Sequence, residues 1–308
     1  MSKQQFGGFT DSDVSDQSGK CFIVTGANTG IGFEVSRVLA ARSGRVLLAC
    51  RDQAKAEAAM ERIRRATPTA DVAFLPLDQA DLVSVRTAAE LATKEPRIDV
   101  LINNAGVMHP PLRRTAQGFE RQFGVNHLGC FALTALLLPK LARTHGSRIV
   151  VTASIAHRRG AIDWADINAE KSYSSVQRYA ASKLANALFF FELDRRLRAA
   201  NSPVTAVGCH PGIAATEIAR NMGPLGLFMP VAGWMFNSAA MGAWPALQAA
   251  TAEVRPGGYY GPTRLNEIRG PSGPAVPTAE ARNPDSAKRL WDLSVAMTGI
   301  DPGLPPAT

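Results

Sequence analysis

The sequence predicts an α/β protein built on a doubly wound parallel sheet with helices on both faces, and three observations support this. Short apolar runs alternate with segments whose apolar residues recur at helical spacing. The connections between the runs are long enough to hold the helices that parallel strands require. The first run ends in the glycine-rich turn Thr25-Gly26-Ala27-Asn28-Thr29-Gly30-Ile31-Gly32, where a helical pattern begins. Such a sheet binds ligands at the carboxyl ends of its strands.

The expected elements follow in order along the chain. Runs rich in β-branched and other apolar residues predict buried strands at 21–24, 46–50, 72–77, 100–102, 148–152 and 204–207. Apolar residues at helical spacing predict one helix that begins at Ile31. The same spacing predicts further helices over 54–65, 82–93, 118–141, 176–199 and 287–296. The alternation of the two patterns gives a single sheet wound in both directions.

Length and composition favour one soluble domain. The chain has 308 residues, of which 46% are hydrophobic and 19% charged. The net charge of +8 is spread over short basic groups on predicted helices, which fits a polyphosphate cofactor and no nucleic acid. We expect residues 1–18 to form a flexible arm, 19–300 the domain and 301–308 a C-terminal tail.

The cysteines and the apolar segments bear on metal sites and location. Four cysteines lack paired metal spacing, so we expect reduced core residues and no metal. No apolar signal segment or run of about 18 apolar residues is present, which favours a cytoplasmic location.

The glycine-rich turn predicts a site for a pyrophosphate. The turn directs backbone N–H groups and the positive end of a helix at its ligand. Gly26 and Gly30 allow a tight turn and a close ligand, and Gly32 allows the helix to pack near the strand. The glycines alone would also suit a plain surface turn, but the flanking strand and helix favour a dinucleotide site formed by Gly26, Asn28, Thr29, Gly30 and Ile31.

The ends of the second and third strands bear on the choice of cofactor. Arg51 stands where a carboxylate would bind the adenosine ribose, and its guanidinium suits a 2′-phosphate. This favours NADP over NAD, although a solvated arginine is the alternative. Asp78 can accept a hydrogen bond from the adenine amino group, or it can cap a helix.

Polar residues at the later strand ends suggest catalysis. Asn104, Ala105 and Gly106 follow the fourth strand, where small residues let the cofactor lie close. An asparagine lies within the apolar stretch of the long helix that follows the fourth strand, and the fifth strand ends at Ser154. The following helix carries a tyrosine and a lysine four residues apart, and therefore on one face. The candidate catalytic residues are Asn126, Ser154, Tyr179 and Lys183.

Together these residues resemble the short-chain dehydrogenase/reductase superfamily over about residues 19–218. The resemblance rests on the glycine-rich turn, Asn103-Asn104-Ala105-Gly106, the four candidate catalytic residues and His210-Pro211-Gly212. Leu48-Ala49-Cys50-Arg51-Asp52 and Ser182-Lys183-Leu184-Ala185-Asn186 are similar to the retinol-dehydrogenase-like branch. Thr152-Ala153-Ser154 departs from the two serines usual there but keeps the second. The resemblance implies a Rossmann fold.

The resemblance also implies a mechanism. Tyr179 would give a proton to a carbonyl oxygen, or take it back, as hydride moves between nicotinamide and substrate. A phenol ordinarily ionises near pH 10, so Lys183 would stabilise the phenolate and also bind the nicotinamide ribose. Ser154 would hold the carbonyl oxygen, and Asn126 would hold a relay water. Pro211, Gly212 and Ile213 would pack on the nicotinamide, and Thr216 would reach its carboxamide or the phosphates.

The remaining expectations concern substrate and partners. An apolar lid over about 212–250, rich in Met, aromatic, Gly and Pro residues at 222–236, would suit a lipophilic aldehyde, ketone or alcohol. The same stretch would also suit a subunit contact or a membrane surface. The family implies a homo-oligomer paired through its long helices. The alternative to an NADP(H)-dependent oxidoreductase is a non-catalytic NADP(H)-binding scaffold or redox sensor; an isomerase fits the apolar lid less well.

Overall fold

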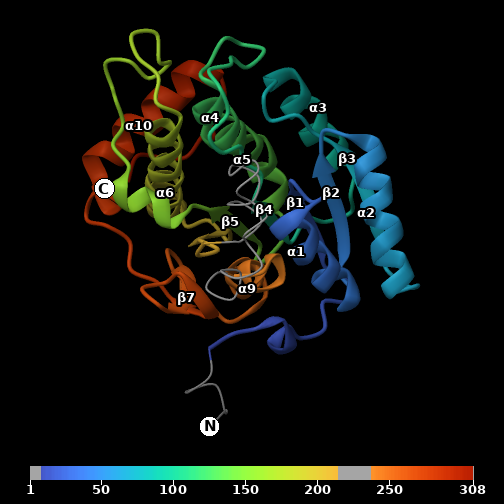
Figure 1. The fold of residues 1–308 in the computed structure, drawn as a ribbon. Coiled ribbons are helices and arrows are strands. Elements are labelled where there is room, and N and C mark those ends of the chain that lie inside the picture. Colours follow the sequence, from blue (N-terminus) through green and yellow to red (C-terminus); the bar gives the residue numbers. More distant parts are fainter. Residues whose placement is uncertain (1–7, 214–236, 308) are drawn as a thin grey trace.

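A computed structural model describes residues 8–213 and 237–307, and these residues form one α/β unit (Figure 1). The sheet of the described residues has eight strands in the order β3-β2-β1-β4-β5-β6-β7-β8. The strands are β1 (Cys21–Thr25), β2 (Arg45–Cys50), β3 (Val72–Pro76), β4 (Val100–Asn103), β5 (Arg148–Thr152), β6 (Thr205–Cys209), β7 (Tyr259–Arg264) and β8 (Arg269–Pro274). Every neighbouring pair is parallel except β7 and β8. The predicted doubly wound parallel sheet is confirmed.

The helices lie on both faces of the sheet (Figure 1). They are α1 (Gly30–Ala41), α2 (Gln53–Ala66), α3 (Leu82–Ala92), α4 (Arg121–Phe123), α5 (Gly129–Leu141), α6 (Ser175–Ala199), α9 (Ala239–Thr251) and α10 (Pro284–Thr298). Short 3₁₀ turns cover Asp11–Asp13, Ile155–Arg159 and Glu280–Arg282, and a π-helical turn covers Gly124–Leu128.

Two apolar cores explain why the strands are hydrophobic throughout. One core joins the sheet to α3, α5, α6 and α10, and the other joins it to α1, α2 and α9. In β1, Cys21 and Ile23 face the first core while Phe22 and Val24 face the second. Both faces of the strand are therefore buried, as expected for a parallel sheet covered by helices on each side.

The predicted flexible arm is wrong for residues 8–18, which pack against the domain. The backbone of Phe9 pairs with that of Ser272 in β8, with the two N–H···O distances at 2.7 and 2.8 Å. Asp11 accepts a hydrogen bond of 3.0 Å from the indole N–H of Trp244 in α9. Val14 and Gln17 are buried. Ser272 and Trp244 lie more than 200 residues after the segment in sequence, so the polar composition of the segment did not reveal these contacts.

The structure also shortens the predicted lid. Residues 239–250 belong to α9, whose Ala243, Ala246 and Leu247 are buried in the core against α1 and the sheet. This part of the range 212–250 is a core helix and not a lid. Residues 214–236 of the range, including the stretch 222–236, lie outside the described residues.

Helix α10 packs on α6, one of the long helices through which we expected subunits to pair. Trp291 of α10 is 3% exposed and meets Phe131 edge to face at 5.4 Å. The guanidinium of Arg196 lies 4.4 Å from the centre of the indole ring. This face of α6 is covered by the same chain, so a subunit contact would use another surface. The homo-oligomer stays a prediction.

One described helical stretch, Arg121–Leu141, is long and apolar enough to cross a membrane by length and composition, with a mean hydropathy of 1.2. It is a weak signal, because 83% of the stretch is buried inside the fold, as in a core helix. The four cysteines are all unpaired and buried, and burial raises the pKa of Cys21 and Cys130 to about 12.

Candidate active site

The glycine-rich turn after β1 has the geometry of an anion site. Gly26 and Gly30 have positive φ angles of 68° and 58°, a conformation that side chains rarely allow. A Cβ atom on Gly32 would lie 2.4 Å from the carbonyl oxygen of Gly26, so only glycine lets α1 approach the turn this closely. Thr29 caps α1 without a side-chain hydrogen bond. The first N–H groups of α1 therefore remain available to an anion.

A cleft of about 540 Å³ opens in front of this turn, beside the ends of β2 and β4. Its size and its lining by backbone N–H groups, glycines and a guanidinium fit the adenosine and pyrophosphate parts of a dinucleotide. It brings together ten of the predicted cofactor-binding residues, namely Gly26, Asn28, Thr29, Gly30, Ile31, Arg51, Asp78, Asn104, Ala105 and Gly106.

Arg51 and Asp78 face each other at the adenosine end of the cleft. A guanidinium nitrogen of Arg51 lies 3.7 Å from a carboxylate oxygen of Asp78, and the Arg51 side chain is 65% exposed. So exposed a pair contributes little energy and leaves Arg51 available to a phosphate. The other Asp78 oxygen accepts the N–H of Ala80 at 2.9 Å, while the cap of α3 is Asp81.

The loop after β4 is fixed against the glycine-rich turn. The hydroxyl of Thr25 accepts hydrogen bonds from the N–H groups of Asn104 and Ala105 at 3.0 and 2.9 Å. The amide of Asn104 donates back to the carbonyl of Thr25 at 2.9 Å. These bonds hold Gly106 beside two of the candidate catalytic residues. A Cβ atom on Gly106 would lie 3.2 Å from Asn126 Oδ1 and 3.4 Å from Lys183 Nζ.

Asn126 lies in the π-helical turn that precedes α5, and it is fully buried. Its amide oxygen accepts the N–H of Val107 at 2.7 Å, and its nitrogen donates to the carbonyl of Val107 at 3.0 Å and to the hydroxyl of Ser182 at 2.9 Å. A π-helical turn inside a helix often marks a functional site. This one explains how an asparagine within an apolar helix finds its partners.

Tyr179 and Lys183 lie on the inner face of α6, and Ser154 follows β5. All three side chains are nearly buried, at 5–6% exposure. Lys183 Nζ donates to the carbonyl of Thr152 at 3.3 Å and lies 5.9 Å from the centre of the Tyr179 ring. The hydroxyl of Ser154 accepts the N–H of Ala156 at 3.2 Å, so this serine also caps a turn.

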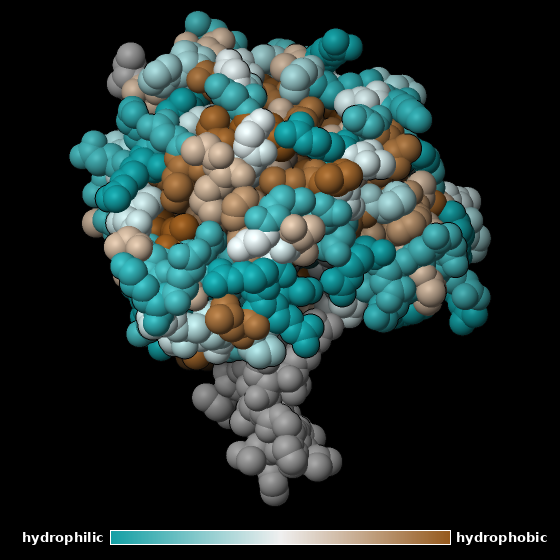
Figure 2. Space-filling view, turned by 90° about the horizontal axis from the view of Figure 1, so that it is seen from above, coloured by the Kyte–Doolittle hydropathy of each residue, from teal (hydrophilic) through white to brown (hydrophobic). Residues whose placement is uncertain are grey.

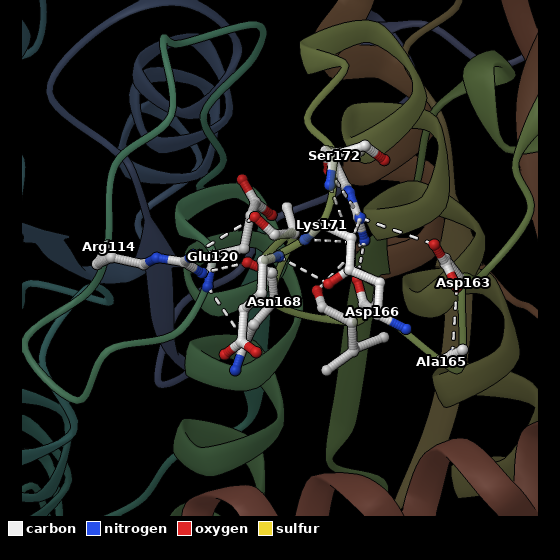
Figure 3. A network of polar contacts seen from close by, with 12 residues as sticks. Arg114, Glu120, Asp163, Ala165, Asp166, Asn168, Lys171 and Ser172 are labelled. Atoms are coloured by element: carbon white, nitrogen blue, oxygen red, sulfur yellow. Dashed lines mark hydrogen bonds and ion pairs between the residues drawn. The ribbon is translucent and has the colours of Figure 1, made fainter.

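The segment between Ser154 and Tyr179 is anchored by a polar network (Figure 3). The carboxylate of Asp166 accepts N–H groups from 170–172 at 2.7 to 3.4 Å, and it binds the guanidinium of Arg178 at 3.1 Å. On the other side, the side chain of Asn168 accepts the N–H of Glu120 at 3.2 Å, while Arg114 donates to its carbonyl. The network fixes the segment to the start of α6, one residue before Tyr179.

The residues expected at the nicotinamide follow β6. Pro211 and Gly212 are buried, and Ile213 is half-buried. Gly212 has a φ of 74°, and a Cβ atom there would lie 2.2 Å from the carbonyl oxygen of Ile268. Thr216, the last residue expected at this end, lies outside the described residues.

His109, which no sequence pattern singles out, lies beside Tyr179. The two rings meet edge to face with centroids 5.2 Å apart. His109 has a φ of 52°, and its N–H donates to buried Gln122 at 3.0 Å. Burial lowers the pKa of His109, which favours the neutral imidazole. The strained backbone of this histidine has no signal in the sequence.

The fold and the site define a class of protein. A glycine-rich turn faces a cleft at the strand ends, and Lys183, with Tyr179 one helical turn before it, lies behind Gly106 in the wall of that cleft. This is the arrangement of a nicotinamide-dependent oxidoreductase.

The comparisons with known proteins identify the family. The model of the short chain dehydrogenase family matches residues 20–224, and the chain belongs to this family. It is 42% identical to mouse retinol dehydrogenase 12 over 286 residues, covering 92% of this chain and 87% of the relative. It is 42% identical to human retinol dehydrogenase 13 over 294 residues, covering 92% and 86%. The crystal structure of an uncharacterized protein from Mycobacterium paratuberculosis matches with a TM-score of 0.80 and 38% identity, covering 96% of this chain and 98% of that one.

The resemblance to the retinol-dehydrogenase-like branch is thereby confirmed, and the chain is an oxidoreductase that uses a nicotinamide cofactor.

Proposed function

We propose that this oxidoreductase uses NADP(H) to interconvert lipophilic aldehydes or ketones and the corresponding alcohols, with Tyr179 as the general acid and base. The observation that carries the proposal concerns Gly106, which lines the cleft. Both Lys183 Nζ and Asn126 Oδ1 lie within 3.4 Å of the place that a Cβ atom on this glycine would occupy. The buried ammonium of Lys183 and the buried amide of Asn126 therefore lie directly behind a glycine that lines the cleft.

The bound cofactor supplies or accepts the hydride. Tyr179 holds the proton for the carbonyl oxygen, and the ammonium of Lys183 stabilises the phenolate that remains after transfer. Ser154 orients the carbonyl by donating its hydroxyl hydrogen, which is compatible with the hydrogen bond that its oxygen accepts from Ala156. Asn126 keeps its π-helical turn fixed beside Lys183 and supports the proton path through a water.

The cations at the cleft support NADP over NAD. Arg51 stands at the end of β2, where an NAD-dependent protein would carry a carboxylate for the ribose hydroxyls. Lys55 on the first turn of α2 and Arg121 at the start of α4 also line the cleft. A 2′-phosphate would gain charge-assisted hydrogen bonds that outweigh the exposed pair of Arg51 with Asp78.

Apolar surface near Tyr179 supports a lipophilic substrate. Val176 is 57% exposed and lies three residues before Tyr179, hence on the same side of α6. Leu112, in the loop that carries His109, is 45% exposed. Figure 2 shows apolar surface gathered in the middle of the top face of the molecule, surrounded by hydrophilic side chains. The similar mammalian proteins are retinol dehydrogenases by name, and retinol is a lipophilic alcohol.

The test is NADPH consumption with a panel of aldehydes and ketones graded from short and polar to long and apolar. We expect turnover to rise along the panel and to exceed turnover with NADH. The Tyr179→Phe variant should lose about 100-fold or more of kcat, while Tyr260→Phe, a change of the same size in β7, should keep the activity.

Tight NADPH binding without turnover on any carbonyl would instead favour the non-catalytic scaffold or redox sensor. A preference for NADH would contradict the role of Arg51. Equal turnover on polar and apolar carbonyls would contradict the lipophilic substrate class.

A further inference from the structure

The tip of the β7–β8 hairpin has a strained backbone, and it contacts His210 and Arg158 next to the candidate active site. Its three consecutive residues Leu265, Asn266 and Glu267 have positive φ angles of 50°, 52° and 67°. None of the three is glycine, so the conformation costs energy at each position. Strain of this kind persists only where the surrounding contacts hold it.

The contacts that hold the tip converge on the carboxylate of Glu267. One oxygen accepts the backbone N–H of Val276 at 3.0 Å. The other accepts from His210 Nε2 at 2.9 Å and from the guanidinium of Arg158 at 2.7 Å. The Glu267 side chain is 14% exposed, and the side chain of His210 is fully buried. Burial alone would raise the pKa of Glu267, but the hydrogen bonds from His210 and Val276 and the positive charge of Arg158 lower it, which favours the ionised carboxylate.

The geometry fixes the tautomer of His210. Its Nδ1 accepts the backbone N–H of Gly212 at 3.2 Å, so that nitrogen carries no hydrogen. Nε2 therefore carries the hydrogen and donates it to Glu267. Burial lowers the pKa of His210, which keeps the ring neutral. Glu267 thus determines which ring nitrogen is free to hold Gly212.

Other residues of the hairpin hydrogen-bond to the loop 210–213, directly or through Asn237. The N–H of Ile213 donates to the carbonyl of Ile268 at 3.0 Å. Asn237 joins the two segments, because its amide donates to the carbonyl of Pro211 at 2.9 Å and accepts the N–H of Gly270 at 3.2 Å. These hydrogen bonds make the position of the loop 210–213 depend on the position of the hairpin.

The hairpin is also tied to the turn that begins at Ser154. Arg158 lies four residues after Ser154, and its guanidinium reaches Glu267 and the carbonyl of Asn266. His157 in the same turn hydrogen-bonds through Nδ1 to the carbonyl of Ser154 at 2.7 Å, and its Nε2 accepts the N–H of Thr278 at 3.4 Å. Glu267 therefore connects the loop expected at the nicotinamide with the turn of the catalytic serine.

We propose that Glu267 is a positioning residue of this enzyme: through His210 and Arg158 it holds the loop 210–213 at the nicotinamide end of the cofactor in register with Ser154. The inference rests on the proposed function, which places the nicotinamide at this loop. Three donors meet one carboxylate, so a glutamine at this position, with a single acceptor oxygen and an NH₂ group, cannot satisfy all of them.

The experiment compares two ligands by calorimetric titration of the full chain. NADP⁺ carries the nicotinamide, whereas adenosine 2′,5′-bisphosphate keeps the adenosine with its 2′-phosphate and 5′-phosphate and lacks the nicotinamide. We expect Glu267→Gln to weaken NADP⁺ binding about tenfold or more, the scale of a lost charge-assisted hydrogen bond. Its affinity for the bisphosphate should equal that of the wild type. Arg158→Met, at a side chain that is 32% exposed, should show the same split.

Glu253→Gln is the matched control, since Glu253 is exposed and lies before the hairpin. It should leave both affinities unchanged. Equal loss of both ligands in Glu267→Gln and Arg158→Met would mean general unfolding and would overturn the positioning role, as would no loss of either. If the wild type binds neither ligand, the proposed cofactor itself is wrong. If the wild type binds both ligands, the affinities of the variants alone decide whether Glu267 positions the loop.

Discussion

The stability of this protein should fall in mild acid because of one histidine next to the candidate catalytic asparagine. His127 is fully buried, with its ring 5.1 Å from that of Phe123 and 5.9 Å from that of Phe189. Its Nε2 hydrogen-bonds to Ser294 of α10 at 2.8 Å. Burial lowers the pKa of His127 from 6.5 to about 3, so the folded chain keeps the ring neutral while the unfolded chain protonates it below pH 6.5.

The magnitude follows from proton linkage. The stabilisation is present above the unfolded pKa of 6.5 and is lost as the pH falls from there toward 3, at about 1.4 kcal/mol per pH unit. Between pH 7 and pH 5, His127 alone should lower the free energy of unfolding by about 2 kcal/mol. His157 and His210, whose pKa values burial also lowers, act in the same direction.

Urea unfolding at the two pH values measures this loss. We expect His127→Gln to be less stable at pH 7 but to lose about 2 kcal/mol less than the wild type on going to pH 5. His145→Gln, at an exposed histidine, should lose as much as the wild type. An identical loss in the wild type and in His127→Gln would refute the reasoning, because the buried ring would then not be the group that resists protonation.

Three further changes probe the cleft and the core. Gly32→Ala should cost about 1–3 kcal/mol of stability and weaken NADP⁺ binding, because its Cβ would lie 2.4 Å from the carbonyl oxygen of Gly26; urea unfolding and calorimetry measure the two effects. Arg51→Ala should raise the KM for NADPH by about tenfold and leave the KM for NADH nearly unchanged, as steady-state kinetics can show. Trp291→Ala should lower the free energy of unfolding by about 3–5 kcal/mol, because its indole is 3% exposed.

Each of these has a contradicting result. Wild-type binding by Gly32→Ala would show that α1 need not approach the turn closely. A parallel rise of both KM values in Arg51→Ala would exclude recognition of the 2′-phosphate, and Arg65→Ala, an exposed arginine on α2, is its control. A cost below about 1 kcal/mol in Trp291→Ala would mean that α10 adds little to the core.

The parts of the fold that were predictable have a local cause. Strands buried on both faces require continuous apolar runs, and Cys21–Thr25 and Arg148–Thr152 show them. Helix α6 runs over Ser175–Ala199, one residue from its predicted start, because Ser174 caps it by accepting the N–H of Gln177. The strand-end residues of the cofactor cleft were found because parallel strands end at one edge of the sheet.

The parts that were missed depend on distant partners. Strands β7 and β8 contain Gly-Pro pairs and no apolar alternation. β8 is the edge strand, where such residues are tolerated, and β7 pairs with β6 only at Tyr259 and Tyr260, before its own Gly-Pro pair. The π-helical turn at Asn126 and the positive φ of His109 arise from tertiary contacts. The contacts of Glu267 could not be predicted, because its partners Arg158 and His210 lie 109 and 57 positions earlier in the sequence.

The edge strand β8 has a consequence for how the chain is made. Phe9 finds its backbone partner only after Ser272 has been synthesised, and Phe189 on the apolar side of α6 is covered only after Trp291 has been synthesised. The nascent chain therefore keeps this apolar surface exposed until the segment that contains Ser272 and Trp291 has been made. Chains that stop before residue 272 should therefore expose the surfaces that chaperones and proteases recognise.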